Sequence, residues 1–271
     1  MFEIIYLWYN QGMEFIKVAR RKSFLASSMH VLLNIALVAM IWLSIWVTGS
    51  PFVAVGLVLM SKWRVFAVRP RFWAANVKSN LVDLIVCLSL TGLMWASGAA
   101  NISISTVILA TIYIVWLIAI KPQSKKIFID TQAIFSIFIG FFALFVIGYN
   151  WSASAIVILA WLIGYSAFRH VLAVKEHNSL EILSLMWGLI LAEIGWVFNH
   201  WTVGYPLFGI SSLAVPQVAI IAAVLSFLVF SMYRAKEDDS KISFQEIILP
   251  LLFTLAVFVV VMGFFSSSPQ I

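Results

Sequence analysis

Residues 180–202 have the sequence LEILSLMWGLILAEIGWVFNHWT, and this stretch decides the class of the fold. After Glu181 at its start, a single ionisable side chain, Glu193, interrupts the apolar run before His200. A helix rises about 1.5 Å per residue, and a bilayer core about 30 Å thick needs roughly 20 mostly apolar residues. We therefore predict that this stretch crosses a membrane as a helix.

The rest of the chain has the same apolar character. Of its 271 residues, 63% are hydrophobic and 10% are charged, and the mean hydropathy is +1.05. Soluble domains are about 45–50% apolar and about 25% charged. One soluble core cannot hide this much apolar surface, so the composition excludes soluble globular, disordered and collagen-like chains.

Similar stretches recur and predict an all-α, polytopic membrane bundle of about nine transmembrane helices with short loops. The second stretch is the weakest, because Lys62 and Arg64 follow Met60, and the count is eight if it is re-entrant. We expect residues 25–271 to form one transmembrane domain and residues 1–24 an interfacial amphipathic segment. The predicted spans are 25–48, 51–68, 80–98, 103–120, 127–148, 153–168, 180–202, 213–233 and 245–265.

The charges predict an orientation. With the N-terminus inside and the helices alternating, all 17 Lys and Arg residues fall in inner segments, and the predicted outer segments hold none. This bias is the positive-inside rule, so we place the N-terminus inside, the C-terminus outside and the chain in a bacterial inner membrane. The outer segments are 48–51, 97–103, 149–154, 201–212 and the tail from 266.

Several predicted inner loops open alike, with AVRP at 67–70 and AIKP at 119–122, which is compatible with a helical-hairpin repeat of about 50 residues. The helices that follow begin with an acid, and three of these acids stand three residues after a capping residue. That spacing resembles a capping box, so we predict helix caps there. The pairs are Asn80 with Asp83, Asn178 with Glu181, and Ser243 with Glu246.

Asp130 departs from this pattern, because Ile127 stands three residues before it. We expect an interfacial acid that pairs with Lys125 and Lys126, and the alternative is an inner gate residue on a polar route.

A basic aromatic loop follows the second predicted span. Cations interleaved with aromatic rings at the inner surface suit anionic lipid headgroups, and a phosphate-bearing substrate such as a polyprenyl phosphate is the alternative ligand. We expect no nucleic-acid partner. The cations are Lys62, Arg64, Arg69, Arg71 and Lys78, and the rings are Trp63, Phe66, Phe72 and Trp73.

Glu193 is the main candidate site residue. It stands twelve residues after Glu181, which is about 18 Å into a core of about 30 Å. An ionised acid there costs about 2.5–3.5 kcal/mol, so we expect it to face the protein interior and to exchange a proton. Trp196, Asn199 and His200 continue this proton or solute site, to which Asp130 is added as the gate. A structural hydrogen bond between helices is the alternative role of Glu193.

These residues favour a proton-linked secondary transporter of a small solute. The first alternative is an intramembrane enzyme on a lipid or isoprenoid, with Glu193 or Asp130 as acid or base. The second is a structural or assembly subunit of a membrane complex. Catalytic motifs such as HExxH, GxSxG and the Walker loop are absent from the sequence, and Cys87 is the only cysteine, so an enzyme is the less favoured class and we expect no metal and no cofactor.

Overall fold

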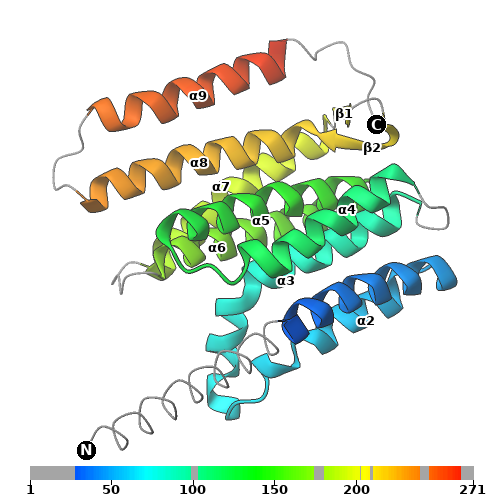
Figure 1. The fold of residues 1–271 in the computed structure, drawn as a ribbon. Coiled ribbons are helices and arrows are strands. Elements are labelled where there is room, and N and C mark those ends of the chain that lie inside the picture. Colours follow the sequence, from blue (N-terminus) through cyan, green and yellow to red (C-terminus); the bar gives the residue numbers. More distant parts are fainter. Residues whose placement is uncertain are drawn as a thin grey trace, which may run out of the picture.

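A computed structural model shows a bundle of roughly parallel and antiparallel helices (Figure 1). The structure describes residues 28–98, 103–173, 180–201, 203–207, 210–238 and 244–263. The predicted interfacial segment 1–24 lies outside the described residues. The helices are Ser28–Thr48, α2 (Pro51–Ser61), α3 (Trp73–Ala96), α4 (Ile104–Val115), α5 (Lys126–Ile147), α6 (Ala153–Leu172), α7 (Leu180–Asn199), α8 (Gln217–Asp238) and α9 (Phe244–Gly263).

Six of these helices are long and apolar enough to cross a membrane, which confirms an all-α chain with the helices of an integral membrane protein. They are Ser28–Thr48, Pro70–Ala96, Lys126–Ile147, Ala153–Leu172, Leu180–Asn199 and Gln217–Ala235. Pro51–Ser61, Ile104–Ile120 and Ile247–Gly263 are shorter apolar helices.

The two ends of the bundle differ in how their helices begin. Helix Ser28–Thr48, α3, α5, α7 and α9 begin at one end, drawn at the left of Figure 1, which we call the basic end because the loops there carry the lysines and arginines. Helices α2, α4 and α6 begin at the opposite end. There Ser50, Ser103 and Ser152 accept hydrogen bonds from backbone N–H groups of the first helical turn. Neutral serine caps therefore satisfy these helix starts without a charge.

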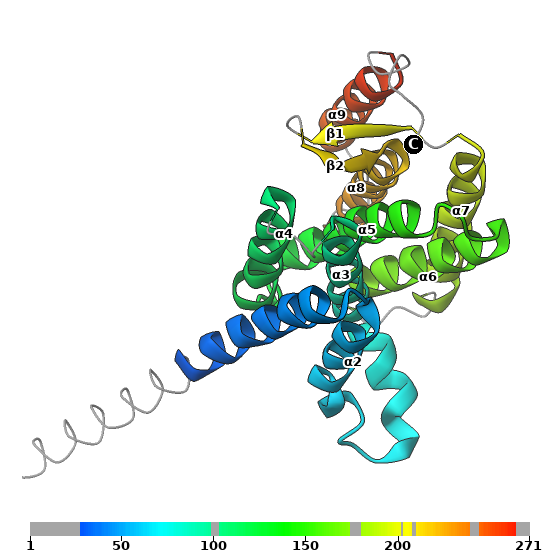
Figure 2. The ribbon, with the colours of Figure 1, turned by 90° about the vertical axis from the view of Figure 1, so that its right-hand side faces the viewer.

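The second and third helices differ from their predicted bounds. α2 ends at Ser61 instead of reaching residue 68, and two short 3₁₀ turns follow, η1 (Trp63–Val65) and η2 (Pro70–Phe72). α3 then begins at Trp73, earlier than predicted, because Pro70 fixes the start of the helical path. Figure 2 shows these turns and the start of α3 projecting away from the bundle.

Helix α5 lies at the centre and packs against α3, α6 and α8. Helices α6 and α7 pack closely through small residues. A Cβ atom on Gly195 of α7 would lie 2.9 Å from the Cβ of Ala160, and one on Gly164 of α6 would lie 3.0 Å from the Cα of Gly188. These glycines allow the two backbones to approach, as is common between helices in membranes.

A two-stranded hairpin covers the opposite end of the bundle, which the sequence analysis did not predict (Figure 2). β1 (Gly204–Leu207) pairs antiparallel with β2 (Ile210–Pro216), and Tyr205 lies opposite Val215. Helix α8 consequently begins at Gln217 and not at residue 213. The Tyr205 hydroxyl donates to the carbonyl of Val261 at 3.0 Å, which connects the hairpin to α9.

Candidate functional site

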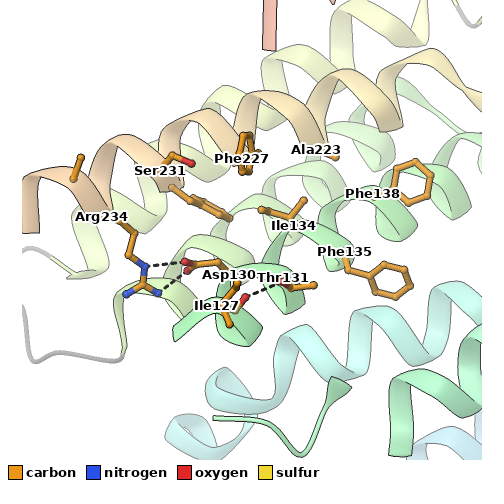
Figure 3. Close-up of a pocket in the computed structure, with 12 residues that line it drawn as sticks. Ile127, Asp130, Thr131, Ile134, Phe135, Phe138, Ala223, Phe227, Ser231 and Arg234 are labelled. Carbon is orange, nitrogen blue, oxygen red and sulfur yellow. Dashed lines mark hydrogen bonds and ion pairs between the residues drawn. The ribbon is translucent and has the colours of Figure 1, made fainter. Parts of the chain in front are cut away.

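A groove with a volume of about 750 Å³ lies between α5 and α8 (Figure 3). We call it the α5–α8 groove. Its walls are mostly aromatic and aliphatic, and its polar groups gather where Asp130 and Arg234 lie, at the basic end. The lining residues are Ile127, Asp130, Thr131, Ile134, Phe135, Phe138, Ala223, Phe227, Phe230, Ser231, Arg234 and Ala235.

The groove extends along much of α5. From Ile127 to Phe138 the helix rises about 16 Å. A smaller cavity of about 110 Å³ shares Phe135 and Phe138 with the groove and reaches Ser105 of α4 and Leu213 of β2. Phenylalanines line much of the groove, so it suits a hydrocarbon chain and not a charged headgroup.

A two-pronged ion pair closes the polar end of the groove (Figure 3). The Arg234 Nε donates to Asp130 Oδ2 at 2.8 Å, and Nη2 donates to Oδ1 at 2.6 Å. Both side chains are half-buried. This planar geometry is the strong form of an Arg–carboxylate pair. Arg234 stands far along the chain from Asp130, on α8, and the sequence analysis had considered only the neighbouring Lys125 and Lys126.

The ion pair also limits the chemistry of the groove. The Asp130 carboxylate already accepts two hydrogen bonds from the Arg234 guanidinium. The pair contains a positive guanidinium and a negative carboxylate side by side. Arg234 can therefore bind a phosphate, and Asp130 can bind an amine. The groove therefore suits an amphiphile with a polar or zwitterionic head at the basic end.

A second polar site lies inside the bundle around Asp83 of α3, which is 8% exposed. Its Oδ2 contacts the ammonium groups of Lys62 and of Lys121, the latter at 2.8 Å. Its Oδ1 accepts hydrogen bonds from the Trp116 indole at 3.1 Å and from the Cys87 thiol at 3.5 Å. We call these five residues the Asp83 cluster.

Three elements bring the cluster together. Cys87 follows Asp83 by one helical turn on α3. Trp116 begins a π-helical turn (η3, Trp116–Ile120) at the end of α4, and Lys121 follows that turn. The wider turn lets both side chains reach the same carboxylate. Lys62 is the first residue after α2. Burial acts to lower the pKa of the Lys62 ammonium, but the neighbouring Cys87 and Asp83 side chains together outweigh burial, so the pKa is raised.

The prediction that Asn80 and Asp83 form a helix cap is therefore wrong. Because α3 begins at Trp73, Asn80 lies inside the helix and donates to the carbonyl of Asn76 at 2.8 Å. The signal in the sequence is that Lys62 and Lys121 each follow an apolar stretch that ends on the same side of the membrane as the start of α3. Their convergence depends on how three helices pack, which spacing alone does not give.

Glu181 is a further acid at the basic end, and it contacts Tyr165 and Lys78. Glu181 lies in the first turn of α7, but Asn178 is outside the described residues, so the predicted cap is not tested. Instead the Tyr165 hydroxyl donates to Glu181 at 2.8 Å, and Lys78 lies 3.1 Å away. Glu246 belongs to α9, and Ser243 lies outside the described residues.

Gln132 and His170 form a junction that the sequence analysis missed. The Gln132 amide donates to the carbonyls of Ile120 at 2.8 Å and Gln123 at 3.0 Å, so it binds the backbone where the π turn ends and the loop to α5 begins. The Nε2 atom of His170 lies 2.9 Å from Oε1 of the Gln132 amide. The junction joins α5 to α4 and α6.

The five predicted headgroup cations divide into two groups. Lys62 is held by Asp83, and Lys78 by Glu181. Arg64, Arg69 and Arg71 are exposed on the projecting turns, together with the rings of Trp63, Phe66, Phe72 and Trp73. The guanidinium of Arg71 lies 4.6 Å from the centre of the Phe72 ring.

Glu193 does not lie in the groove, and the prediction that it faces the protein interior is wrong for this chain. Its side chain is exposed, as are Trp196 and His200. His200 donates through Nδ1 to the carbonyl of Trp196 at 2.9 Å, and their rings pack edge to face. Asn199 is half-buried. The small face of α7 packs on α6, which turns Glu193 outward and separates it from Asp130 on α5.

Among the described residues, no group of three or more His, Cys, Asp and Glu side chains could hold a metal ion. Comparison with known protein families, with curated proteins and with solved structures finds no match to this chain. The function must therefore be argued from the sites themselves.

Proposed function

We propose that this chain is a lipid-binding protein of a bacterial inner membrane, and that the α5–α8 groove holds the tail of a long-chain amphiphile. The polar head lies at the basic end, against Asp130 and Arg234. The observation that carries the proposal is the shape and polarity of the groove: about 750 Å³ of mostly apolar wall with one ion pair at its end. Ligand sites commonly have this volume and few convergent polar groups.

In this proposal nine helices cross the membrane, with the N-terminus inside and the C-terminus outside. The ends of α2 and of α4 with its π turn support this topology. Lys62 after α2 and Lys121 after η3 meet on the same buried Asp83, so both helices return to the basic end. The loops of that end carry the cations, which agrees with the positive-inside rule.

The exposed turns between α2 and α3 provide a second contact with lipid. Arg64, Arg69 and Arg71, with the surrounding aromatic rings, bind anionic headgroups at the inner surface. Their role is to anchor the basic end, whereas the groove selects the amphiphile.

A large side chain placed in the groove tests whether the groove binds a lipid tail. Ala223 is 8% exposed and lines the groove, so Ala223→Phe places a ring where the tail would lie. We expect mass spectrometry of the purified protein to show loss of an amphiphile that is enriched over bulk membrane lipid in the wild type.

The matched control is Ala143→Phe, in a separate apolar cavity of about 300 Å³ between α3, α5 and α6. Both variants add the same ring to an apolar wall. Equal lipid content in the wild type and Ala223→Phe, or a loss only in Ala143→Phe, contradicts the proposal.

Proton-linked transport of a small solute stays a prediction with a separate test. Uptake into vesicles should depend on Glu193 if that residue carries the proton, and wild-type uptake by Glu193→Gln contradicts it. The exposed position of Glu193 in one copy of the chain gives that function less support than the groove gives lipid binding.

A further inference from the structure

Helix α7 carries a continuous exposed face that no other described element covers. Its residues follow one another at intervals of four, three, four, three and four, the heptad spacing of helices that pack side by side. In the four hydrophobic residues more than half of the side chain is exposed, and Glu193 and His200 are exposed as well. The face consists of Ile182, Met186, Leu189, Glu193, Trp196 and His200.

The other side of α7 already has its partner. Gly188 and Gly195 pack on α6, where a Cβ atom on either would lie 3.1 Å or less from Trp161 or Ala160. Taking 100° per residue, the exposed face lies about 120–140° around the helix from these glycines. The exposed face is therefore free to contact a second helix without disturbing the contact between α6 and α7. Figure 2 shows α7 at the edge of the bundle, beside α6.

Glu193 makes the exposed face unsuited to lipid alone. It lies about 18 Å along α7 from Glu181, which is paired with Lys78 at the basic end. No ion pair or hydrogen bond joins Glu193 to another residue of the described ranges. Carboxyl groups inside a membrane are costly and normally face another protein group.

We propose that the exposed face of α7 binds the same face of a second copy of this chain. Two copies inserted in the same orientation place their α7 helices parallel, so a two-fold axis brings each residue of the face against its equivalent. The two Glu193 side chains then meet. One protonated carboxyl donates to the other, which needs no cation at this depth.

A second copy fits better than a foreign helix because the face complements itself. A single polar position in an apolar heptad row sets the register and the number of helices. All Lys and Arg residues of the chain lie in its predicted inner segments, so a pair of acids that share a proton is the polar contact that two copies offer at this level.

Cysteine crosslinking in native membranes tests the interface. Cys87 is the only cysteine of the chain, and Cys87→Ser provides a background that keeps a donor beside Asp83. In that background, Met186→Cys, Leu189→Cys and Trp196→Cys should each give an oxidised dimer. Ile158→Cys, on an equally exposed residue of α6 at a comparable distance from the opposite end, should not.

Substitution of Glu193 tests the carboxyl pair. Glu193→Gln keeps a donor and an acceptor and should preserve the dimer, whereas Glu193→Leu removes both. A hydrogen bond between membrane helices is worth about 1–2 kcal/mol in peptides, so the dimer dissociation constant should rise roughly 5- to 30-fold in Glu193→Leu. Fluorescence energy transfer between labelled full-length copies in liposomes measures it.

Three results overturn the proposal: crosslinks at Ile158 as strong as those on α7, unchanged association of Glu193→Leu, or crosslinks from the α7 cysteines to a different protein only. None of these results depends on whether the α5–α8 groove binds a lipid.

Discussion

Asp83 and Glu193 are both carboxylates within the apolar part of a long helix, yet their surroundings are opposite. Asp83 lies ten residues into α3, is 8% exposed and contacts two ammonium groups, an indole and a thiol. Glu193 lies thirteen residues into α7 and is exposed on its outward side. Position along a helix gives the depth of a side chain, but the packing of the neighbouring helices decides which way it faces.

The different surroundings of Asp83 and Glu193 indicate two different roles for an acid in an apolar helix. Asp83 receives its partners from α2 and η3 of the same chain, so it contributes to the fold of one copy. Glu193 has no such partner among the described residues and is left for association with another copy. Substitutions at the two positions should therefore affect different measurements.

The largest effect is expected for Asp83→Leu, which leaves the ammonium groups of Lys62 and Lys121 without their counter-charge. Removing one partner of a buried ion pair costs about 3–5 kcal/mol. We expect a loss of this size in the free energy of unfolding, measured by denaturant titration of the purified protein in mild detergent.

A triple variant serves as the control for this loss. Asp83→Leu combined with Lys62→Met and Lys121→Met removes all three charges, and buried ion pairs replaced by apolar residues are often neutral in stability. Recovery of most of the loss supports the charge argument. If the triple variant is no more stable than Asp83→Leu, the packing of the cluster matters more than its charges.

The next effect separates the two lysines of the Asp83 cluster. Lys62 has 13% of its side chain exposed, whereas Lys121 has 39% exposed. Solvent screens the more exposed pair. Lys62→Met should therefore lower the free energy of unfolding more than Lys121→Met in the same titration. The reverse order contradicts the assignment of Lys62 as the main partner.

Much of the helical architecture could be predicted from the sequence, because each helix must satisfy its own backbone hydrogen bonds in lipid and needs a long apolar run. The predicted span 127–148 matches α5 (Lys126–Ile147), and 103–120 matches α4 with its π turn. The β-hairpin at 204–216 was missed, because its short strands lack a regular alternation and were attributed to a loop and to the start of α8.

The sites were predicted less well for a related reason. Asp130 was predicted to pair with Lys125 and Lys126 or to act as an inner gate, whereas the structure pairs it with Arg234, 104 residues away in the chain. The predicted cap at Asp83 and the predicted inward position of Glu193 are both wrong. In each case the missing information was which helix lies beside which, and a single sequence contains no measure of that.

An intermediate effect is expected at the ion pair of the groove. Asp130→Ala and Arg234→Ala each leave a half-buried charge without its partner, and the double variant removes both charges. Contacting groups of this kind commonly show coupling energies of about 0.5–3 kcal/mol. A double-mutant cycle on unfolding should give a coupling in this range, below the loss in Asp83→Leu.

The same variants should change lipid binding in different ways if the head of the amphiphile lies at the pair. Arg234→Ala removes the cation and should release a lipid with a phosphate, while Asp130→Ala keeps it. Equal lipid content in both variants contradicts the placement of the head at this pair, although a tail in the groove would still be detected by Ala223→Phe.

The smallest effect on the stability of one copy is expected for Glu193→Leu. The side chain is exposed and has no partner among the described residues, so its removal breaks no contact within the chain and places an apolar group in an apolar environment. We expect the unfolding midpoint of the monomer, measured at dilution in detergent, to stay the same or rise slightly. A large loss of stability would mean that Glu193 supports the fold as Asp83 does, and the contrast between the two acids would then disappear. Unchanged monomer stability together with weaker association in liposomes is the combination that only an acid directed at a second copy explains.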